Sequence, residues 1–273
     1  MTRTAATTGT SRVNGIDLHH EAHGSGEPLI LLHGGLGHSD MFGDLRSRLA
    51  EKRQVIGVDL QAHGRTADID RPIRYERMAD DIAALIRHLG LERTDIMGYS
   101  LGGGVALRTA IQHPALVKKI VLISTPFAQS GWYPEIDASM KGLDGSAAAE
   151  MRETPMYQSY VAVAPRPDDF PRLLDKMGNL MSQGYDWSDE ISAMKTPAML
   201  IIGDHDAIPP SHMVRFYELL GGGKQDAGWD GGNMVESRLA ILPGLTHYNV
   251  FLAPEVADIA LPFLSGEDTA RKW

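Results

Sequence analysis

One serine of the chain lies where it could act as a nucleophile. Ser100 is the centre of a G-x-S-x-G pattern, 98–102, between a strand-like run at 95–99 and a helical pattern that begins at Leu101. A sharp turn from strand to helix strains the central residue and leaves no room for side chains at the flanking glycines. The helix start also offers unpaired N–H groups beside the hydroxyl. The pattern favours nucleophilic catalysis by Ser100, and the competing interpretation is a glycine-rich helix start that only packs closely.

An acid and a base follow two later strand-like runs. Asp206 comes soon after the run 198–202, and His247 comes soon after the run 239–242. The carboxyl ends of the strands in an open α/β sheet form the edge where ligands bind, so these side chains and Ser100 should meet there. A histidine can take the proton of a serine hydroxyl while a carboxylate orients its imidazole. We therefore predict a triad of Ser100, His247 and Asp206.

A glycine-rich segment, His33-Gly34-Gly35-Leu36-Gly37, follows the first buried strand-like run. Glycines let the backbone turn and aim its N–H groups at a ligand. An acyl-transfer site needs such donors for the oxyanion that develops on the attacked carbonyl. We expect the N–H groups of Gly35 and Leu101 to form this oxyanion hole, with Leu36 as the alternative to Gly35. His33 is expected to hold the loop.

Four side chains raise a second possibility, a metal site, and they are Asp204, His205, Asp206 and His212. Neighbouring side chains on a turn point in different directions, and no second group of ligands is evident, so we expect no metal and no other cofactor. The 273 residues include no cysteine, which excludes thiolate nucleophiles, thiolate zinc sites and disulfides. Ser100 is then the one well-placed nucleophile.

Strand-like and helix-like patterns alternate along the chain, which is typical of an α/β fold with a mostly parallel sheet flanked by helices. Short continuous apolar runs indicate strands buried on both faces, and they are 28–32, 55–60, 95–99, 117–123, 198–202 and 239–242. Apolar residues at helical spacing lie between them, at 78–89, 101–113, 211–220 and 256–264. Residues 17–23 are expected to add an antiparallel strand at the edge.

The alternation breaks at residues 126–196, which contain no matching strand-like run. We interpret this segment as a helical cap inserted into an α/β core of residues 13–125 and 197–264. It is rich in methionine and aromatic residues. Most of them should form the cap's own core, while Trp132 and Trp187 are candidates to face a substrate.

With these motifs in order, the sequence resembles the α/β-hydrolase superfamily, in its capped, esterase-like or lactonase-like branch. The segments 33–35 and 98–102 resemble the family's oxyanion loop and nucleophile turn. Residues 59–66 resemble its D-x-x-G-x-G-x-S loop, with alanine at 62 and threonine at 66. Residues 203–210 fit its acid motif G-x-x-D-x-I-x-P, which favours Asp206 over Asp204 as the triad acid.

The resemblance implies a serine carboxylic ester hydrolase that acts on small to medium acyl esters through an acyl-enzyme. A lactonase, including one for acyl-homoserine lactones, needs no new residues because a lactone is an internal ester. Carbon–carbon bond hydrolases, amidases, perhydrolases, ligand-sensing receptors, and cofactor-free lyases or oxygenases remain alternatives. A serine at position 100 argues against haloalkane dehalogenase and epoxide hydrolase chemistry, for which this family uses aspartate.

Charge and hydropathy bear on the partners and the localisation that we expect for this chain. The net charge is −9 and no basic tract is present, which argues against a nucleic-acid partner. The apolar runs are far shorter than the ~20 residues of a membrane helix, and the first 15 residues lack the apolar stretch of a secretory signal. We expect a cytoplasmic monomer or homodimer whose partner is a small-molecule ester or lactone. Residues 1–12 and 265–273 are interpreted as flexible tails, and 221–233 as a surface insertion.

Overall fold

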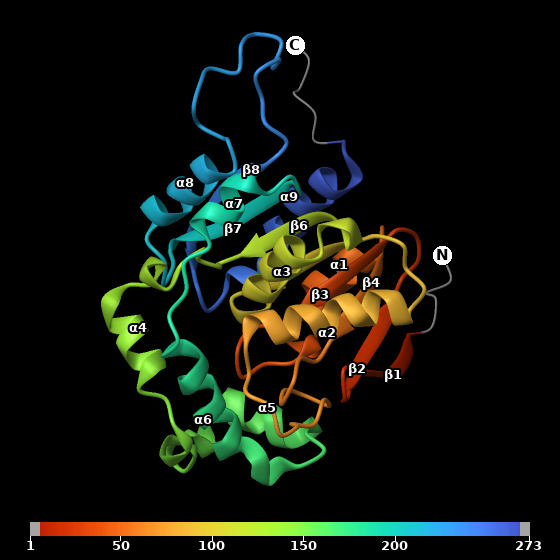
Figure 1. Cartoon of the computed structure of the whole chain (residues 1–273), viewed down its shortest axis with the longest axis vertical. Coiled ribbons are helices and arrows are strands. Elements are labelled where there is room, and N and C mark those ends of the chain that lie inside the picture. Colours follow the sequence, from red (N-terminus) through yellow and green to blue (C-terminus); the bar gives the residue numbers. More distant parts are fainter. Residues whose placement is uncertain (1–5, 268–273) are drawn as a thin grey trace.

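The computed structural model describes residues 6–267, whose strands form one eight-stranded sheet (Figure 1). The strand order is β1-β2-β4-β3-β5-β6-β7-β8. β2 pairs antiparallel with β1 and β4, and the other neighbours are parallel, so the prediction of a mostly parallel sheet is confirmed. The strands are β1 (Thr7–Val13), β2 (Ile16–His23), β3 (Pro28–Leu32), β4 (Gln54–Val58), β5 (Thr94–Tyr99), β6 (Val117–Ile123), β7 (Ala198–His205) and β8 (Arg238–Thr246).

Helices cover both faces of this sheet, as predicted. One face packs against α2 (Tyr75–His88), α3 (Leu101–Gln112) and α8 (Pro210–Leu219). The other face packs against α1 (Gly43–Ala50) and α9 (Pro254–Ser265). Both faces are therefore buried, which is why the central strands are continuous apolar runs and not alternating ones.

Strand β3 shows this double burial residue by residue. Ile30 and Leu32 lie in the hydrophobic cluster under α2 and α3, whereas Leu29 and Leu31 lie in the cluster under α1 and α9. All four side chains are completely buried. The strand that leads to the glycine-rich loop is thus held from both sides.

Between β6 and β7 the chain leaves the sheet for a run of helices, which we call the β6–β7 segment. Its helices are α4 (Pro134–Lys141), α5 (Pro155–Val163), α6 (Phe170–Met181) and α7 (Ser188–Ala193). Figure 1 shows α4, α5 and α6 outside the sheet and its covering helices, while α7 packs against α8. Helix α6 is strongly amphipathic, and its buried face includes Phe170, Leu174, Met177 and Met181 at spacings of three or four residues.

The interpretation of residues 1–12 as a flexible tail is wrong for residues 7–12. They form β1, which pairs with β2 from Thr7–Ala22 to Val13–Ile16. The connecting turn is Asn14-Gly15, where both residues have positive φ, the geometry that asparagine and glycine favour in two-residue hairpins. This dipeptide is the signal that the sequence interpretation missed. Residues 1–5 and 268–273 lie outside the described residues, and Ser265 still belongs to α9.

Helix α1 was not predicted. It is eight residues long and buries only Leu45 and Leu49, so its sequence shows too little apolar periodicity to stand out. The loop 221–233, interpreted as a surface insertion, connects α8 to β8 and extends away from the sheet in Figure 1. No helix within residues 6–267 is long and apolar enough to cross a membrane.

Candidate active site

The structure brings Ser100, His247 and Asp206 together at the carboxyl edge of the sheet. Ser100 follows β5, Asp206 follows β7, and His247 follows β8. His247 Nε2 lies 3.2 Å from Ser100 Oγ, and His247 Nδ1 lies 2.9 Å from Asp206 Oδ1. An ionised carboxylate only accepts hydrogen bonds, so Nδ1 carries the ring proton and Nε2 presents its lone pair to the serine hydroxyl. This is the arrangement in which an imidazole can deprotonate a hydroxyl.

The turn at Ser100 has the backbone geometry expected from the sequence. Ser100 has φ of 51° and ψ of −113°, a conformation that is costly for a residue with a side chain. A Cβ atom on Gly98 would overlap the backbone of Gly102, and one on Gly102 would overlap the carbonyl of Leu32. The strand and the helix therefore approach each other too closely for side chains at these two positions.

Ser124, which the sequence interpretation did not single out, completes the surroundings of Asp206. It directly follows β6, is completely buried, and donates a hydrogen bond from its hydroxyl to Asp206 Oδ2. The Asp206 side chain has no exposed area, so both of its oxygens depend on protein donors. Position at the end of a parallel strand is the signal that could have identified this serine.

Tyr99 holds the loop that carries His247. Its hydroxyl donates a hydrogen bond of 2.7 Å to the carbonyl oxygen of His247, and the two rings lie 5.2 Å apart. Burial, with the charge of Asp206 as a smaller cause, raises the pKa of Tyr99 well above its usual value. The phenol therefore stays protonated and remains a donor. Trp132, from the β6–β7 segment, contacts the His247 ring edge-on at 5.4 Å.

The two predicted oxyanion donors lie at the same cavity wall as Ser100. Gly35 and Leu101 both line that cavity, as does Leu36. Neither the N–H of Gly35 nor that of Leu101 donates a hydrogen bond to another residue in the described range 6–267. Leu36 has φ of 58°, in the left-handed region, so the loop turns sharply directly after Gly35. The arrangement leaves both N–H groups available to a ligand.

His33 links the glycine-rich loop to the segment that follows β4. Leu60 N–H donates to His33 Nε2 at 3.0 Å, so the ring proton lies on Nδ1, which donates to the Gly34 carbonyl at 2.7 Å. Burial lowers the pKa of His33 and keeps the ring neutral. Ala62, at the place of the family's first glycine in the loop 59–66, adopts φ of 65°, which explains the preference for glycine there.

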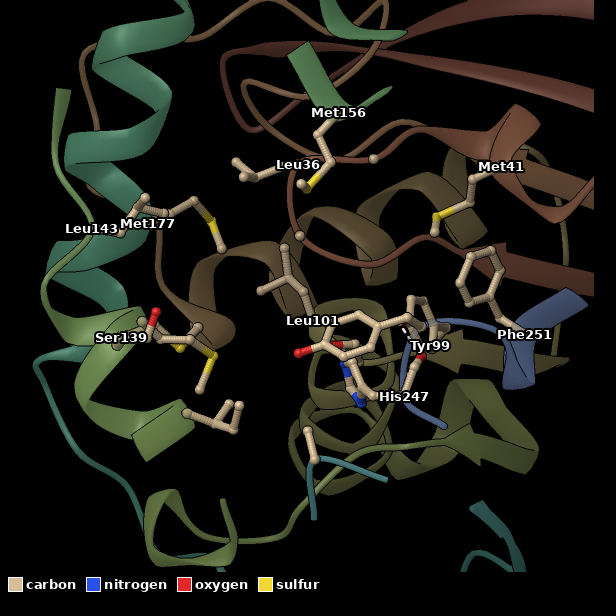
Figure 2. A pocket seen from close by; sticks show the side chains of 18 of the residues that line it. Leu36, Met41, Tyr99, Leu101, Ser139, Leu143, Met156, Met177, His247 and Phe251 are labelled. Carbon is tan, nitrogen blue, oxygen red and sulfur yellow. Dashed lines mark hydrogen bonds between the residues drawn. The ribbon is translucent and has the colours of Figure 1, made fainter. Parts of the chain in front are cut away.

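A cavity of about 660 Å³ opens in front of Ser100 and His247 (Figure 2). Its wall is mostly apolar, with contributions from the sheet edge, from the loop after β8 and from the β6–β7 segment. Trp132 lines it, whereas Trp187 is not part of its wall and packs against Tyr75, Tyr185 and Arg108. Four of the six methionines in residues 126–196 also line it, namely Met140, Met156, Met177 and Met181.

The residues weighed as metal ligands are engaged elsewhere. Asp204 Oδ1 is 2.8 Å from Nδ1 of the exposed His205 and accepts from Gly244 N–H at 2.7 Å. His212 stacks on Phe127 and accepts its backbone N–H at 3.2 Å. Within residues 6–267, no group of three or more histidine, aspartate or glutamate side chains is arranged to hold a metal ion.

A family model and several curated proteins match parts of this sequence. A family model described as alpha/beta hydrolase fold matches residues 27–155. A Haemophilus influenzae protein, provisionally named an esterase/lipase, is 32% identical over 105 residues, which are 38% of this chain and 36% of that protein. The chain thus aligns with only about a third of the length of the first curated relatives. An AB hydrolase superfamily protein of Bacillus subtilis, YisY, is 29% identical over 77% of this chain and 85% of its own length.

Solved structures support the same classification. A carboxylesterase from Bacillus subtilis superposes with a TM-score of 0.73 at 19% identity, covering 96% of this chain and 93% of that one. An esterase from Thermogutta terrifontis superposes with a TM-score of 0.68 at 22% identity, covering 97% and 100%. The sheet and its covering helices define an alpha/beta hydrolase fold. The chain belongs to the alpha/beta hydrolase fold family.

Proposed function

We propose that this protein is a serine hydrolase of carboxylic esters with small to medium acyl groups. The observation that carries the proposal is the continuous contact from Asp206 through His247 to Ser100 at the wall of an apolar cavity. The esterase names among its relatives agree with this function. Lactones fall within the same chemistry, because opening a lactone breaks the same type of bond.

The proposed reaction has two halves. Ser100 Oγ attacks the ester carbonyl carbon, His247 Nε2 takes the hydroxyl proton, and Asp206 stabilises the resulting imidazolium. The N–H groups of Gly35 and Leu101 stabilise the oxyanion, each contributing a few kcal/mol. His247 then protonates the departing alcohol oxygen, which leaves an acyl-serine. Water attacks this acyl group, gives its proton to His247 and releases the acid, while Ser100 recovers its proton.

We propose in addition that residues 126–196 act as a cap on a core of residues 13–125 and 197–264. Methionine side chains are long and unbranched, so they adapt to acyl groups of different shape. The volume of about 660 Å³ lies within the range of small-molecule sites. This wall is therefore where acyl-chain preference should be set.

The test is hydrolysis of p-nitrophenyl esters of graded acyl length by the wild type and by Ser100→Ala. We expect turnover by the wild type, and a loss of several orders of magnitude in the variant with an unchanged circular dichroism spectrum. A serine-directed organophosphate should abolish activity, with one adduct located on Ser100 by mass spectrometry. If the wild type binds esters or lactones without turning them over, the protein is a ligand-sensing receptor and the proposal is wrong.

A further inference from the structure

The apolar cavity contains hydroxyl groups that the proposed reaction does not use. Apart from Ser100 and the tyrosines, the hydroxyl-bearing side chains on its wall within residues 6–267 are Ser139 and Ser159. Ser139 is on α4 and Ser159 is on α5, so both come from the β6–β7 segment. A polar group in a mostly apolar pocket fixes the orientation of a ligand more than it adds affinity.

Ser159 is oriented by a histidine from the core. Its Oγ lies 2.7 Å from His38 Nε2, across 121 positions of sequence. His38 Nδ1 accepts the N–H of Asp40, as the cap of the short helix that starts at Ser39. The ring proton therefore lies on Nε2 and is donated to Ser159 Oγ. With its oxygen occupied as an acceptor, Ser159 has its own O–H free to donate towards the cavity.

A carboxylate and two arginines lie near His38, and their charges have opposing effects on the pKa of its ring. Asp40 is the carboxylate next to His38, and its nearest oxygen is 3.5 Å from Nδ1. The same carboxylate binds Arg46 at 2.9 Å and Arg65 at 2.7 Å. Burial alone would raise the pKa of Asp40, but these two arginines outweigh it and lower the pKa to about 2. Burial lowers the pKa of His38, so a neutral ring faces Ser159.

Ser139 lacks these features. It is solvent-exposed, and its hydroxyl has no hydrogen-bond partner among the described residues. Ser159 is only partly exposed. A hydrogen bond to a ligand competes with water at an exposed hydroxyl, whereas an oriented and partly buried hydroxyl loses little freedom when it binds. Of the two serines, Ser159 is therefore the better placed to discriminate between ligands, because its hydroxyl is oriented and partly buried.

We propose that Ser159 determines substrate specificity by donating a hydrogen bond to an acceptor oxygen carried by the substrate some distance from the reacting ester. The substrate class is therefore acyl esters with an in-chain carbonyl, preferred over plain alkyl esters of equal length. Met156, one turn before Ser159 on α5, is separated from His247 by Leu101 in the view of Figure 2. Ser159 is on α5 and Ser100 precedes α3, so we expect the acceptor oxygen to lie several bonds from the reacting carbonyl. This proposal rests on the esterase function proposed above.

The test compares p-nitrophenyl octanoate with its isomeric oxo-octanoates, with the ketone moved from the fourth carbon outward. One isomer should exceed the plain octanoate in kcat/KM by about 3- to 10-fold in the wild type, the range expected for one neutral hydrogen bond. In Ser159→Ala this preference should disappear, while kcat/KM for plain octanoate stays within about 2-fold. Alanine is the best helix former, so α5 tolerates the change. Ser139→Ala is the matched control and should keep the preference.

Three results overturn the proposal while leaving the esterase function intact. They are the lack of a preferred isomer in the wild type, an equal loss of kcat/KM for all esters in Ser159→Ala, and loss of the preference in Ser139→Ala as well. The second result would assign the Ser159–His38 bond to anchoring of α5 only. A wild type that turns over no ester of the series overturns both this proposal and the proposed function.

Discussion

The hydroxyl of Ser124 can be removed without altering the proposed nucleophile, base or acid. Within residues 6–267, it supplies one of the two hydrogen bonds that the Asp206 carboxylate accepts, and that side chain has no exposed area. A hydrogen bond to a charged group contributes about 1.5–3 kcal/mol. Because the hydrogen bond between His247 and Asp206 remains, only part of this free energy should be lost from the stabilisation of the transition state. We expect Ser124→Ala to lower kcat/KM about 10-fold and the free energy of unfolding by about 1–3 kcal/mol.

Backbone strain must be separated from the lost hydrogen bond, because Ser124 has φ of 48°. Ser124→Gly is the matched variant. It also lacks the hydroxyl, yet glycine adopts this φ without the cost of about 1 kcal/mol that a Cβ imposes. Both variants should therefore show the same loss of kcat/KM on p-nitrophenyl butyrate. In urea unfolding, the glycine variant should be the more stable of the two.

Two outcomes would refute the reasoning about Ser124. Wild-type kcat/KM in both variants would mean that Asp206 is positioned without this donor. A loss in Ser124→Ala that is absent in Ser124→Gly would assign the effect to the backbone conformation, because glycine lacks the hydroxyl too. Titration of Ser100 with an organophosphate gives the fraction of active sites in each preparation, so that misfolded protein is not counted as slow enzyme.

Two further predictions concern the acid of the triad and one buried histidine, His63. Asp206→Asn should lower kcat/KM about 10³- to 10⁴-fold, because an amide does not hold the Nδ1–H tautomer of His247. Asp204→Asn keeps an acceptor for Gly244 N–H, so its kcat/KM should stay within about 3-fold of the wild-type value. If steady-state kinetics show the larger loss in Asp204→Asn, Asp204 is the acid. Burial lowers the pKa of His63 to about 3, so below pH 6.5 the unfolded chain binds a proton that the folded chain does not. Through this group, the free energy of unfolding should fall by about 2 kcal/mol between pH 7 and pH 5. Urea unfolding of His63→Gln at the two pH values should show a correspondingly smaller fall. An equal fall in the variant and the wild type would contradict the prediction.

Much of the fold was predictable because burial on both sheet faces leaves a direct trace in the sequence. The runs at β3, at 120–123 in β6 and at 198–202 in β7 are apolar without alternation. A pattern of that kind can be recognised without knowing which strands are neighbours. Helix α1 and the hairpin of β1 and β2 leave weaker traces. The first buries two residues only, and the second is specified by the dipeptide Asn14-Gly15, whose positive φ values close the turn.

The contacts around the site were less predictable, because they join residues that are far apart in the chain. Ser124 and Asp206 are 82 positions apart, and His38 and Ser159 are 121 apart. Neither serine belongs to a recognisable motif. A serine at the end of a strand or in a short helix is common, and only its distant partner distinguishes it from a solvated surface residue.

The sequence by itself determined the local parts of the site. The flanking glycines of Ser100 and the strand-to-helix order specify a strained turn with an exposed hydroxyl, since these depend on a few consecutive residues. The tertiary structure alone decided which side chains complete the site. It placed His247 between Ser100 and Asp206, included Trp132 but not Trp187 in the cavity wall, and set Ser159 against His38. Such contacts arise from the packing of whole elements across the sheet edge, and local sequence does not encode the distances between elements.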